Sequence, residues 1–197
     1  KKKLSQNDLQ RKNIYSCPQT LFKIHPDFDQ IIFDIIEMDK KAIVYLIKDR
    51  RKVWFKKLIN RFSKNNKYDP AKIVFIDPLN YEDYLLHIGK ASVLLDPIYY
   101  GAGNSFFESM LFGTPTVTLP TDHIKSRLVL GAYKQMEIID PPIAKNIKNY
   151  VDLAVNYANR DDIGKIKNIY KKAAEKKLFN TKKAGEEFNK ILLNLFN

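Results

Sequence analysis

Short apolar runs alternate with segments of helical periodicity along the first three quarters of the chain. The runs are rich in β-branched residues and nearly continuous, as strands buried on both faces of a parallel sheet must be. They lie at 13–17, 42–47, 72–76, 92–96, 116–119 and 136–139. Between them, apolar residues return every three or four positions, as on one face of a helix. The pattern predicts an α/β fold: a doubly wound, Rossmann-like parallel sheet of six strands in the order 3-2-1-4-5-6.

The segments between the runs carry helix start and stop signals. Helices are expected at 27–38, 53–62, 81–88, 105–112 and 124–134. Asn80, Asn104 and Asp122 stand where N-cap residues are needed for the last three of these helices. Gly113 follows 105–112 as its stop signal.

The last quarter of the chain is purely helical in pattern. From Ile143 onward the sequence predicts helices over about 146–158, 161–177 and 181–196, the last capped by Thr181. We therefore expect a basic leader or linker over 1–12, one Rossmann-like domain over 13–142, and C-terminal helices over 143–197 that pack on the same domain. The chain begins with lysine, and we expect it to be a piece of a longer protein.

Charge is distributed unevenly along the chain, whose net charge is +12. Residues 1–67 carry 17 basic and 7 acidic side chains, residues 68–144 carry 5 and 9, and residues 145–197 carry 12 and 6. A nucleic-acid reader concentrates its lysines around one recognition element, whereas these lie at both ends. The pattern favours solvated helix faces over a nucleic-acid footprint, with an acidic membrane surface or a partner domain as further options.

A single cysteine limits the chemistry further. Cys17 excludes an intrachain disulfide and a multi-cysteine zinc site, and it indicates a reducing compartment such as the cytoplasm. Because it ends a buried strand, we interpret it as an inert thiol rather than a nucleophile. No segment approaches the roughly 18 apolar residues of a membrane span.

The predicted strand order places a candidate site at one edge of the sheet. The first and fourth strands are neighbours, so the loops 18–26 and 96–105 meet at their carboxyl ends. The first loop offers Gln19, Thr20 and Lys23. The second loop offers glycines and leads into a helix whose first backbone N–H groups attract anions. This pairing indicates a site for a diphosphate.

Other nucleotide and metal signatures are missing or misplaced. No G-x-G-x-x-G follows the first strand and no P-loop occurs, which disfavours NAD binding and ATP hydrolysis. Asp27 and Asp29 have D-x-D spacing, but they open a helix, where acidic side chains favour the helix dipole. We therefore predict no metal and no other cofactor. Glycines after the fourth strand are instead typical of the carboxy-terminal, nucleotide-sugar domain of GT-B glycosyltransferases.

The chain from about Tyr15 to Phe196 resembles the carboxy-terminal catalytic half of the O-linked N-acetylglucosamine transferase family, including its bacterial and SPINDLY-like relatives. The resemblance runs in order through "PQTLFKIHP", "PLNYEDYLLHIGKASVLLDP", "GNSFFESMLFGTPTVTLP", "SR" at 126–127 and "LFNTK" at 178–182. It implies one half of a GT-B fold that uses a nucleotide sugar, with UDP-sugar the first expectation. The amino-terminal catalytic half, any tetratricopeptide repeats and the acceptor site would then lie outside this chain.

The resemblance also implies roles for individual residues. Lys23 matches the lysine on the donor diphosphate, which is the nearest to a catalytic residue in this half. The expected donor-binding residues are Gln19 and Thr20 beside it, Tyr81, Tyr84 and His87 around the base, Asn104 and Ser105 on phosphate, and Glu108 on the ribose. This chain reads "GAGNS" where the family commonly reads N-G-H-T-T, so Gly103 stands at the histidine position.

These inferences predict the donor-binding half of a protein O-glycosyltransferase that transfers a sugar such as N-acetylglucosamine to a protein side chain. Alone, the chain is expected to bind the donor without turnover. Two alternatives stay open at this point: half of a nucleotide-sugar 2-epimerase, or a non-catalytic module, either a degenerate GT-B half or a basic surface for nucleic acid.

Overall fold

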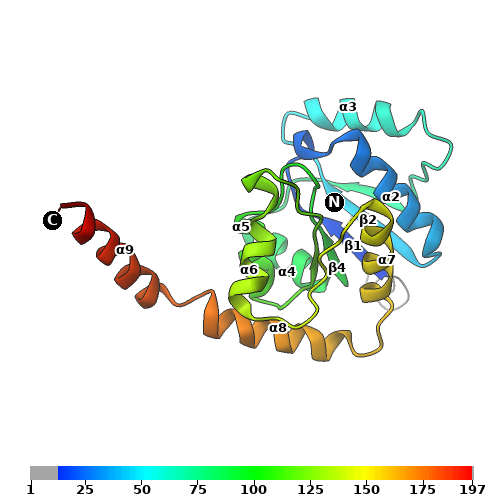
Figure 1. Cartoon of the computed structure of the whole chain (residues 1–197). Coiled ribbons are helices and arrows are strands. Elements are labelled where there is room, and N and C mark those ends of the chain that lie inside the picture. Colours follow the sequence, from blue (N-terminus) through cyan, green and yellow to red (C-terminus); the bar gives the residue numbers. More distant parts are fainter. Residues whose placement is uncertain (1–12, 197) are drawn as a thin grey trace.

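One parallel sheet lies at the centre of the molecule (Figure 1). The computed structural model describes residues 13–196. The strands are β1 (Asn13–Cys17), β2 (Ala42–Ile47), β3 (Ile73–Ile76), β4 (Val93–Leu95) and β5 (Thr116–Val117). Their order is β3-β2-β1-β4-β5, and every neighbouring pair is parallel. The α/β class and the predicted order are confirmed for these five strands.

The predicted sixth strand, 136–139, is wrong. Helix α6 (Leu128–Met136) runs into this segment, and Glu137, with φ of 56°, ends the helix in the left-handed region. Ile139 is 89% exposed, so the short apolar run does not mark a buried strand. At the position next to β5, where the sixth strand was expected, Thr118 and Ile143 form an isolated parallel bridge.

Helices and two 3-10 turns connect the strands. They are the turn at Leu21–Lys23, α2 (Pro26–Met38), α3 (Val53–Phe62), α4 (Tyr81–Lys90), α5 (Asn104–Met110), the turn at Ile124–Ser126, and α6. The cap at Asn80 is confirmed, because its side chain accepts the N–H of Asp83 at 2.8 Å. Gly113 has φ of 65° in the turn after α5, as a stop signal requires.

Two predicted caps are wrong. Asn104 is the first residue of α5 itself, and Gly103 takes the cap position, which has no side-chain hydrogen bond. Asp122 caps nothing, because the hydroxyl of Ser126 organises this turn instead. It accepts the N–H of Thr121 and donates to the carbonyl of His123. The segment 124–134 is consequently divided into a 3-10 turn and α6.

Successive strand residues face opposite sides of the sheet, and helices cover both sides. On one side Tyr15 and Cys17 of β1 join a large core with Phe28 and other residues of α2. On the other side Ile14 joins a smaller core with Ile88 of α4. This division makes the sheet doubly wound and leaves the carboxyl edge of the strands for the connecting loops.

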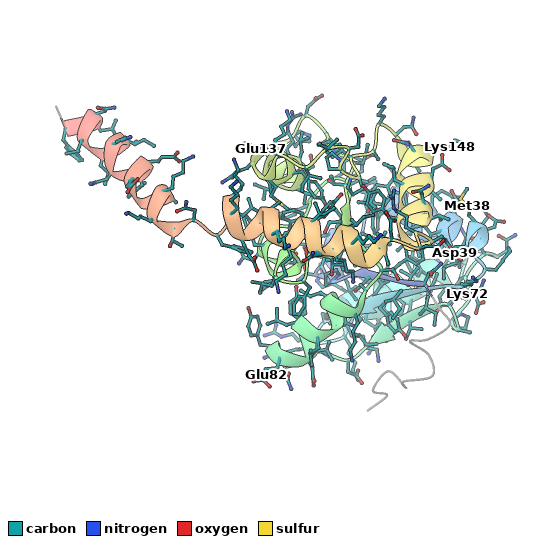
Figure 2. The ribbon with its side chains drawn as sticks, turned by 90° about the horizontal axis from the view of Figure 1, so that it is seen from below. Met38, Asp39, Lys72, Glu82, Glu137 and Lys148 are labelled. Atoms are coloured by element: carbon teal, nitrogen blue, oxygen red, sulfur yellow. The ribbon has the colours of Figure 1, made fainter. Side chains whose placement is uncertain are left out.

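The C-terminal helices differ in how they contact this domain. Helix α7 (Ile147–Ala158) packs on α2, and α8 (Ile163–Lys177) buries Tyr170 and Ala174. Asp39, labelled in Figure 2, lies between the end of α2 and α7, where it accepts hydrogen bonds from Tyr15 and Asn159.

Helix α9 (Thr181–Phe196) departs from the expectation that the C-terminal helices all pack on the domain. It has no buried residue and stands apart from the other helices in both views (Figures 1 and 2). Its predicted cap is also wrong by one residue, because Asn180, not Thr181, accepts the N–H of Lys183 at 3.0 Å. The expected basic leader, 1–12, lies outside the described residues. Within 13–196, no helix combines the length and the apolar character needed to cross a membrane.

Candidate functional site

The loops after β1 and β4 meet at the carboxyl edge of the sheet and are joined by polar side chains. The side-chain amide of Gln19 donates a hydrogen bond through Nε2 to the hydroxyl of Ser105, which lies 86 positions later in the sequence. Lys23 Nζ donates to Gln19 Oε1 at 2.8 Å and to the carbonyl of Gly101 at 3.2 Å. The predicted strand order thus brings Gln19, Lys23 and Ser105 together.

The Lys23 ammonium is a half-buried positive charge at this junction. It lies 4.4 Å from the centre of the Tyr100 ring, where the electron-rich face attracts a cation. Burial lowers the pKa of Lys23, and the carboxyl group of Asp96 opposes that shift. An ammonium has three N–H donors, and two are used by Gln19 and Gly101. The third N–H group of Lys23 is left to donate to an anionic ligand.

Asp96, which the sequence reasoning passed over, shapes the second loop from within. Its carboxylate accepts the N–H of Ala102 at 2.5 Å and the hydroxyl of Thr118 at 2.7 Å. Burial raises the pKa of Asp96 to about 7, against the effect of these hydrogen bonds and of Lys23. A Cβ at Gly101 would lie 2.9 Å from Asp96 Oδ2, so the loop can wrap the carboxylate only with glycine there. The one available signal was an acidic residue at the end of a buried strand.

A cleft of about 430 Å³ opens beside this junction. It is formed by the loops after β1, β2 and β3 together with the first turn of α4 and Glu108 of α5. The lining residues are Pro18, Gln19, Thr20, Leu21, Ile47, Lys48, Asp49, Arg50, Pro78, Leu79, Tyr81, Tyr84 and Glu108. The structure therefore places five predicted donor-binding residues in one cleft. Lys23 and Ser105 adjoin it through Gln19.

One wall of the cleft couples α4 to α5. The Tyr84 hydroxyl donates to Glu108 Oε2 at 3.0 Å, and burial, together with the charge of Glu108, raises the pKa of Tyr84. The rings of Tyr81 and Tyr84 are nearly parallel, at 19°, with centres 6.4 Å apart. Tyr81 is 61% exposed and offers a ring face to a planar group. Because Tyr84 contacts Oε2, Oε1 of Glu108 can accept hydrogen bonds from a ligand's hydroxyl groups.

His87 does not join this cleft. It is 4% exposed, its Nε2 lies 2.8 Å from the Ser16 hydroxyl, and its ring packs edge-on against Tyr45. Burial lowers the pKa of His87 to about 4, so the ring is neutral at pH 7. The sequence pattern did not show that His87 faces the sheet, whereas Tyr84, one turn earlier, reaches the cleft.

Gly103 and Asn104 also lie outside the cleft lining, at the start of α5. That helix has only seven residues, so its dipole offers an anion less than the sequence reasoning assumed. A Cβ at Gly103 would approach only Leu128, at 3.9 Å, and the position therefore has room for a side chain.

Three polar residues of the cleft were missed by the sequence reasoning. Lys48, Asp49 and Arg50 follow β2, so the rule that parallel strands end at one edge could have found them. Lys48 pairs with Asp77 at 3.0 Å, and Asp49 accepts N–H groups at the start of α3. Arg50 is exposed and forms no ion pair with a carboxylate of the described residues. Its guanidinium can therefore contact a ligand.

Among residues 13–196, no three His, Cys, Asp or Glu side chains lie close enough together to hold a metal ion. The groups of the candidate site that are open to a ligand are the Lys23 ammonium, the Arg50 guanidinium, the Glu108 carboxylate and the ring of Tyr81, whereas Lys48 and Asp49 are engaged by neighbouring protein groups.

Comparisons with known proteins find chains that are similar to this one in sequence or in fold. A curated relative, the UDP-N-acetylglucosamine–peptide N-acetylglucosaminyltransferase of Caenorhabditis elegans, is 27% identical over 144 residues, which are 72% of this chain and 12% of the relative. A Thermobaculum terrenum O-GlcNAc transferase variant superposes with a TM-score of 0.74 at 16% identity, over 84% of this chain and 32% of the other. HepE of Anabaena, solved with UDP and glucose, superposes with a TM-score of 0.67 at 10% identity, over 96% of this chain and 50% of the other.

The solved structures show the fold, which is that of one half of a GT-B glycosyltransferase. The chain spans only about an eighth of the curated relative and a third of the Thermobaculum enzyme. The family itself is shown by sequence, because the characteristic pattern of glycosyl transferase family 41 matches residues 4–188. The chain belongs to glycosyl transferase family 41.

Proposed function

We propose that the cleft binds a nucleoside-diphosphate sugar, with UDP-sugar as the first choice. In this proposal the chain is the donor-binding half of a protein O-glycosyltransferase. Two named relatives support it: one is a UDP-N-acetylglucosamine–peptide N-acetylglucosaminyltransferase, and HepE was solved with UDP and glucose. Both names fit a pyrimidine nucleotide donor, and the first also fits a protein acceptor and N-acetylglucosamine.

The observation that carries the proposal is the continuity of two subsites. The Lys23–Gln19–Ser105 network offers donors at one end of the cleft, where a diphosphate would lie. Glu108 and the stacked tyrosines form the wall beyond it, where a ribose diol and a base would lie. The groups suited to a diphosphate, a ribose and a base thus follow one another in the order that these parts have in a nucleotide.

In the proposed reaction an acceptor hydroxyl attacks the anomeric carbon of the sugar as the bond to the diphosphate breaks, and the products are the glycosylated acceptor, the nucleoside diphosphate and the proton released from the hydroxyl. Negative charge grows on the departing diphosphate, and the free N–H of Lys23 is positioned to stabilise it more strongly in the transition state than in the bound donor. Glu108 and Tyr81 hold the nucleotide in both states. They would therefore affect donor binding, while Lys23 would affect binding and bond cleavage together.

Calorimetric titration of the chain with UDP tests the site. We expect Lys23→Ala and Glu108→Ala each to weaken UDP binding about ten-fold, since each removes a charge-assisted hydrogen bond worth about 1.5 kcal/mol. The control is Lys165→Ala, an exposed lysine of α8, which should leave the affinity unchanged. Equal UDP affinity in all three variants would remove the site assignment. Binding of mixed RNA with no response to UDP would favour the nucleic-acid alternative.

A further inference from the structure

Three exposed aromatic side chains form a row beside the junction of the β1 and β4 loops. Phe22 lies between the other two, 6.1 Å from Trp54 of α3 and 6.4 Å from Tyr100 between ring centres. They are 51%, 43% and 44% exposed, respectively. Contiguous exposed aromatic rings on a domain of this kind mark a contact surface for a partner.

Lysines cover the faces of these rings. Lys57 Nζ lies 4.7 Å from the centre of the Trp54 ring, and Lys125 Nζ lies 5.3 Å from that of Tyr100. Neither lysine forms an ion pair with a carboxylate among residues 13–196. We call the surface formed by Phe22, Trp54, Tyr100, Lys57 and Lys125 the aromatic ledge. It presents two unneutralised ammonium groups on an apolar base.

The ledge adjoins the end of the cleft where a diphosphate would lie. Phe22 immediately precedes Lys23, and Tyr100 lies under the Lys23 ammonium at 4.4 Å. A sugar on the diphosphate must leave the cleft at this end, and an acceptor hydroxyl must arrive here. The ledge is therefore an exposed apolar surface within reach of a polypeptide that brings the hydroxyl.

We propose that the aromatic ledge extends the acceptor site, expected in the amino-terminal half, onto this chain by binding an acidic segment of the acceptor polypeptide. This inference rests on the proposed function, because that function places the transferred sugar beside Lys23. Carboxylates of the segment meet Lys57 and Lys125, and its aliphatic carbons pack on Phe22 and Trp54. The ledge thereby selects acceptors that carry Asp or Glu near the modified residue.

The position of the lysines favours a carboxylate partner over single-stranded nucleic acid. Bases bind proteins of that kind by stacking on free aromatic faces. Here ammonium groups already lie over Trp54 and Tyr100, so a base would first have to displace them. A carboxylate needs no displacement, since it accepts the N–H groups that point away from the rings.

Trp54 makes the ledge directly observable, because it is the only tryptophan of the chain. The experiment titrates the chain with a synthetic peptide that has one serine flanked by glutamates and no aromatic residue, while Trp54 fluorescence is recorded. A matched peptide carries glutamine in place of glutamate. We expect a saturable change with the acidic peptide, at least about ten-fold weaker binding of the glutamine peptide, and loss of affinity at high salt.

Paired variants assign the effect to the ledge. Lys57→Gln with Lys125→Gln should weaken binding of the acidic peptide about ten-fold, and Lys57→Arg with Lys125→Arg should restore it, since arginine keeps the charge. Lys165→Gln with Lys172→Gln, two exposed lysines of α8, is the control for net charge and should change little. Equal thermal midpoints of the variants show that the fold is kept.

Three results would overturn the inference: equal binding of both peptides, no effect of the double glutamine variant beyond its α8 control, or tighter binding of oligouridylate than of the acidic peptide at the same salt. UDP titration of the ledge variant separates this inference from the proposed function. UDP affinity should be unchanged in it. A chain that binds the acidic peptide but not UDP would remove the donor site and leave the ledge as a peptide-binding surface with no part in the choice of acceptor.

Discussion

Gln19 is 6% exposed, yet both ends of its amide are used, one by Ser105 and the other by Lys23. A buried amide is stable only when its donors and acceptors are paired. Gln19 therefore holds the two loops at a fixed separation and orients the Lys23 ammonium. At the scale of single residues, the site is built by polar groups that satisfy one another before any ligand arrives.

The pH dependence of stability tests whether His87 is buried as a neutral ring. Its pKa in the folded chain, about 4, is lower than the ordinary 6.5, because burial disfavours the imidazolium. The unfolded chain thus binds more protons than the folded chain between these values. Stability is lost as the pH falls from 6.5 towards 4, by about 3 kcal/mol from this residue alone.

The variant His87→Gln keeps a polar partner for Ser16 but cannot titrate. We expect its free energy of unfolding to fall less than that of the parent chain between pH 7 and pH 4. Urea unfolding at pH 7, 5.5 and 4 measures the difference. Parallel pH profiles of the two proteins would show that His87 is not buried as a neutral ring.

At the scale of elements, α8 acts on the sheet through α4 and the turn after α5. Lys167 Nζ donates to the carbonyls of Gly89 and Ala91 at the end of α4, at 2.9 and 2.6 Å, and burial lowers its pKa to about 8. The backbone of α8 lies so close to Gly113 that a Cβ there would be 1.8 Å from the Lys167 carbonyl oxygen. Close approach and positive φ both require glycine at this turn.

Gly113→Ala should therefore destabilise the chain by more than about 2 kcal/mol, since it adds left-handed strain to a backbone clash. Gly131→Ala is the matched control, because Gly131 lies on the exposed side of α6 with no atom within 4 Å of a Cβ. That variant should be neutral or stabilising by about 0.5–1 kcal/mol. Thermal unfolding compares the two, and similar midpoints would contradict the close contact between α8 and the turn.

At the scale of the whole molecule, helix α9 contributes no buried side chain to the core of the described residues. The apolar side chains of α9, such as Phe188 and Ile191, are 63% and 57% exposed. Helices with an apolar face gain stability by packing that face on another element, and α9 has no buried residue. Its contribution to the stability of residues 13–180 should be small.

Removal of residues 181–197 should consequently shift the thermal midpoint by less than about 2 °C, equivalent to under about 1 kcal/mol. The control truncation ends at residue 162 and also removes α8, with buried Tyr170 and Ala174. We expect that truncation to lower the midpoint by more than about 10 °C or to prevent folding. A large loss from the first truncation would mean that α9 packs on the domain in solution.

The sequence by itself determined the fold class, the order of the five strands and the meeting of the β1 and β4 loops. These follow from local properties: continuous apolar runs are buried strands, alternation with helices requires parallel pairing, and parallel strands end at one edge. Resemblance of ordered motifs then indicated the family. Tyr81, Tyr84 and Glu108 were likewise predicted for the cleft in which the structure places them.

Only the tertiary structure decided the directions of side chains and the ends of elements. His87 and Tyr84 lie on one helix, yet packing on the sheet buries the first and leaves the second in the cleft. The run 136–139 has strand composition, but α6 continues into it, and the bridge beside β5 is formed instead by Ile143, outside the run. Asp96 and the aromatic ledge depend on contacts between segments far apart in sequence, such as Phe22 with Trp54. A local pattern carries no record of such contacts, because they arise only when the chain has folded.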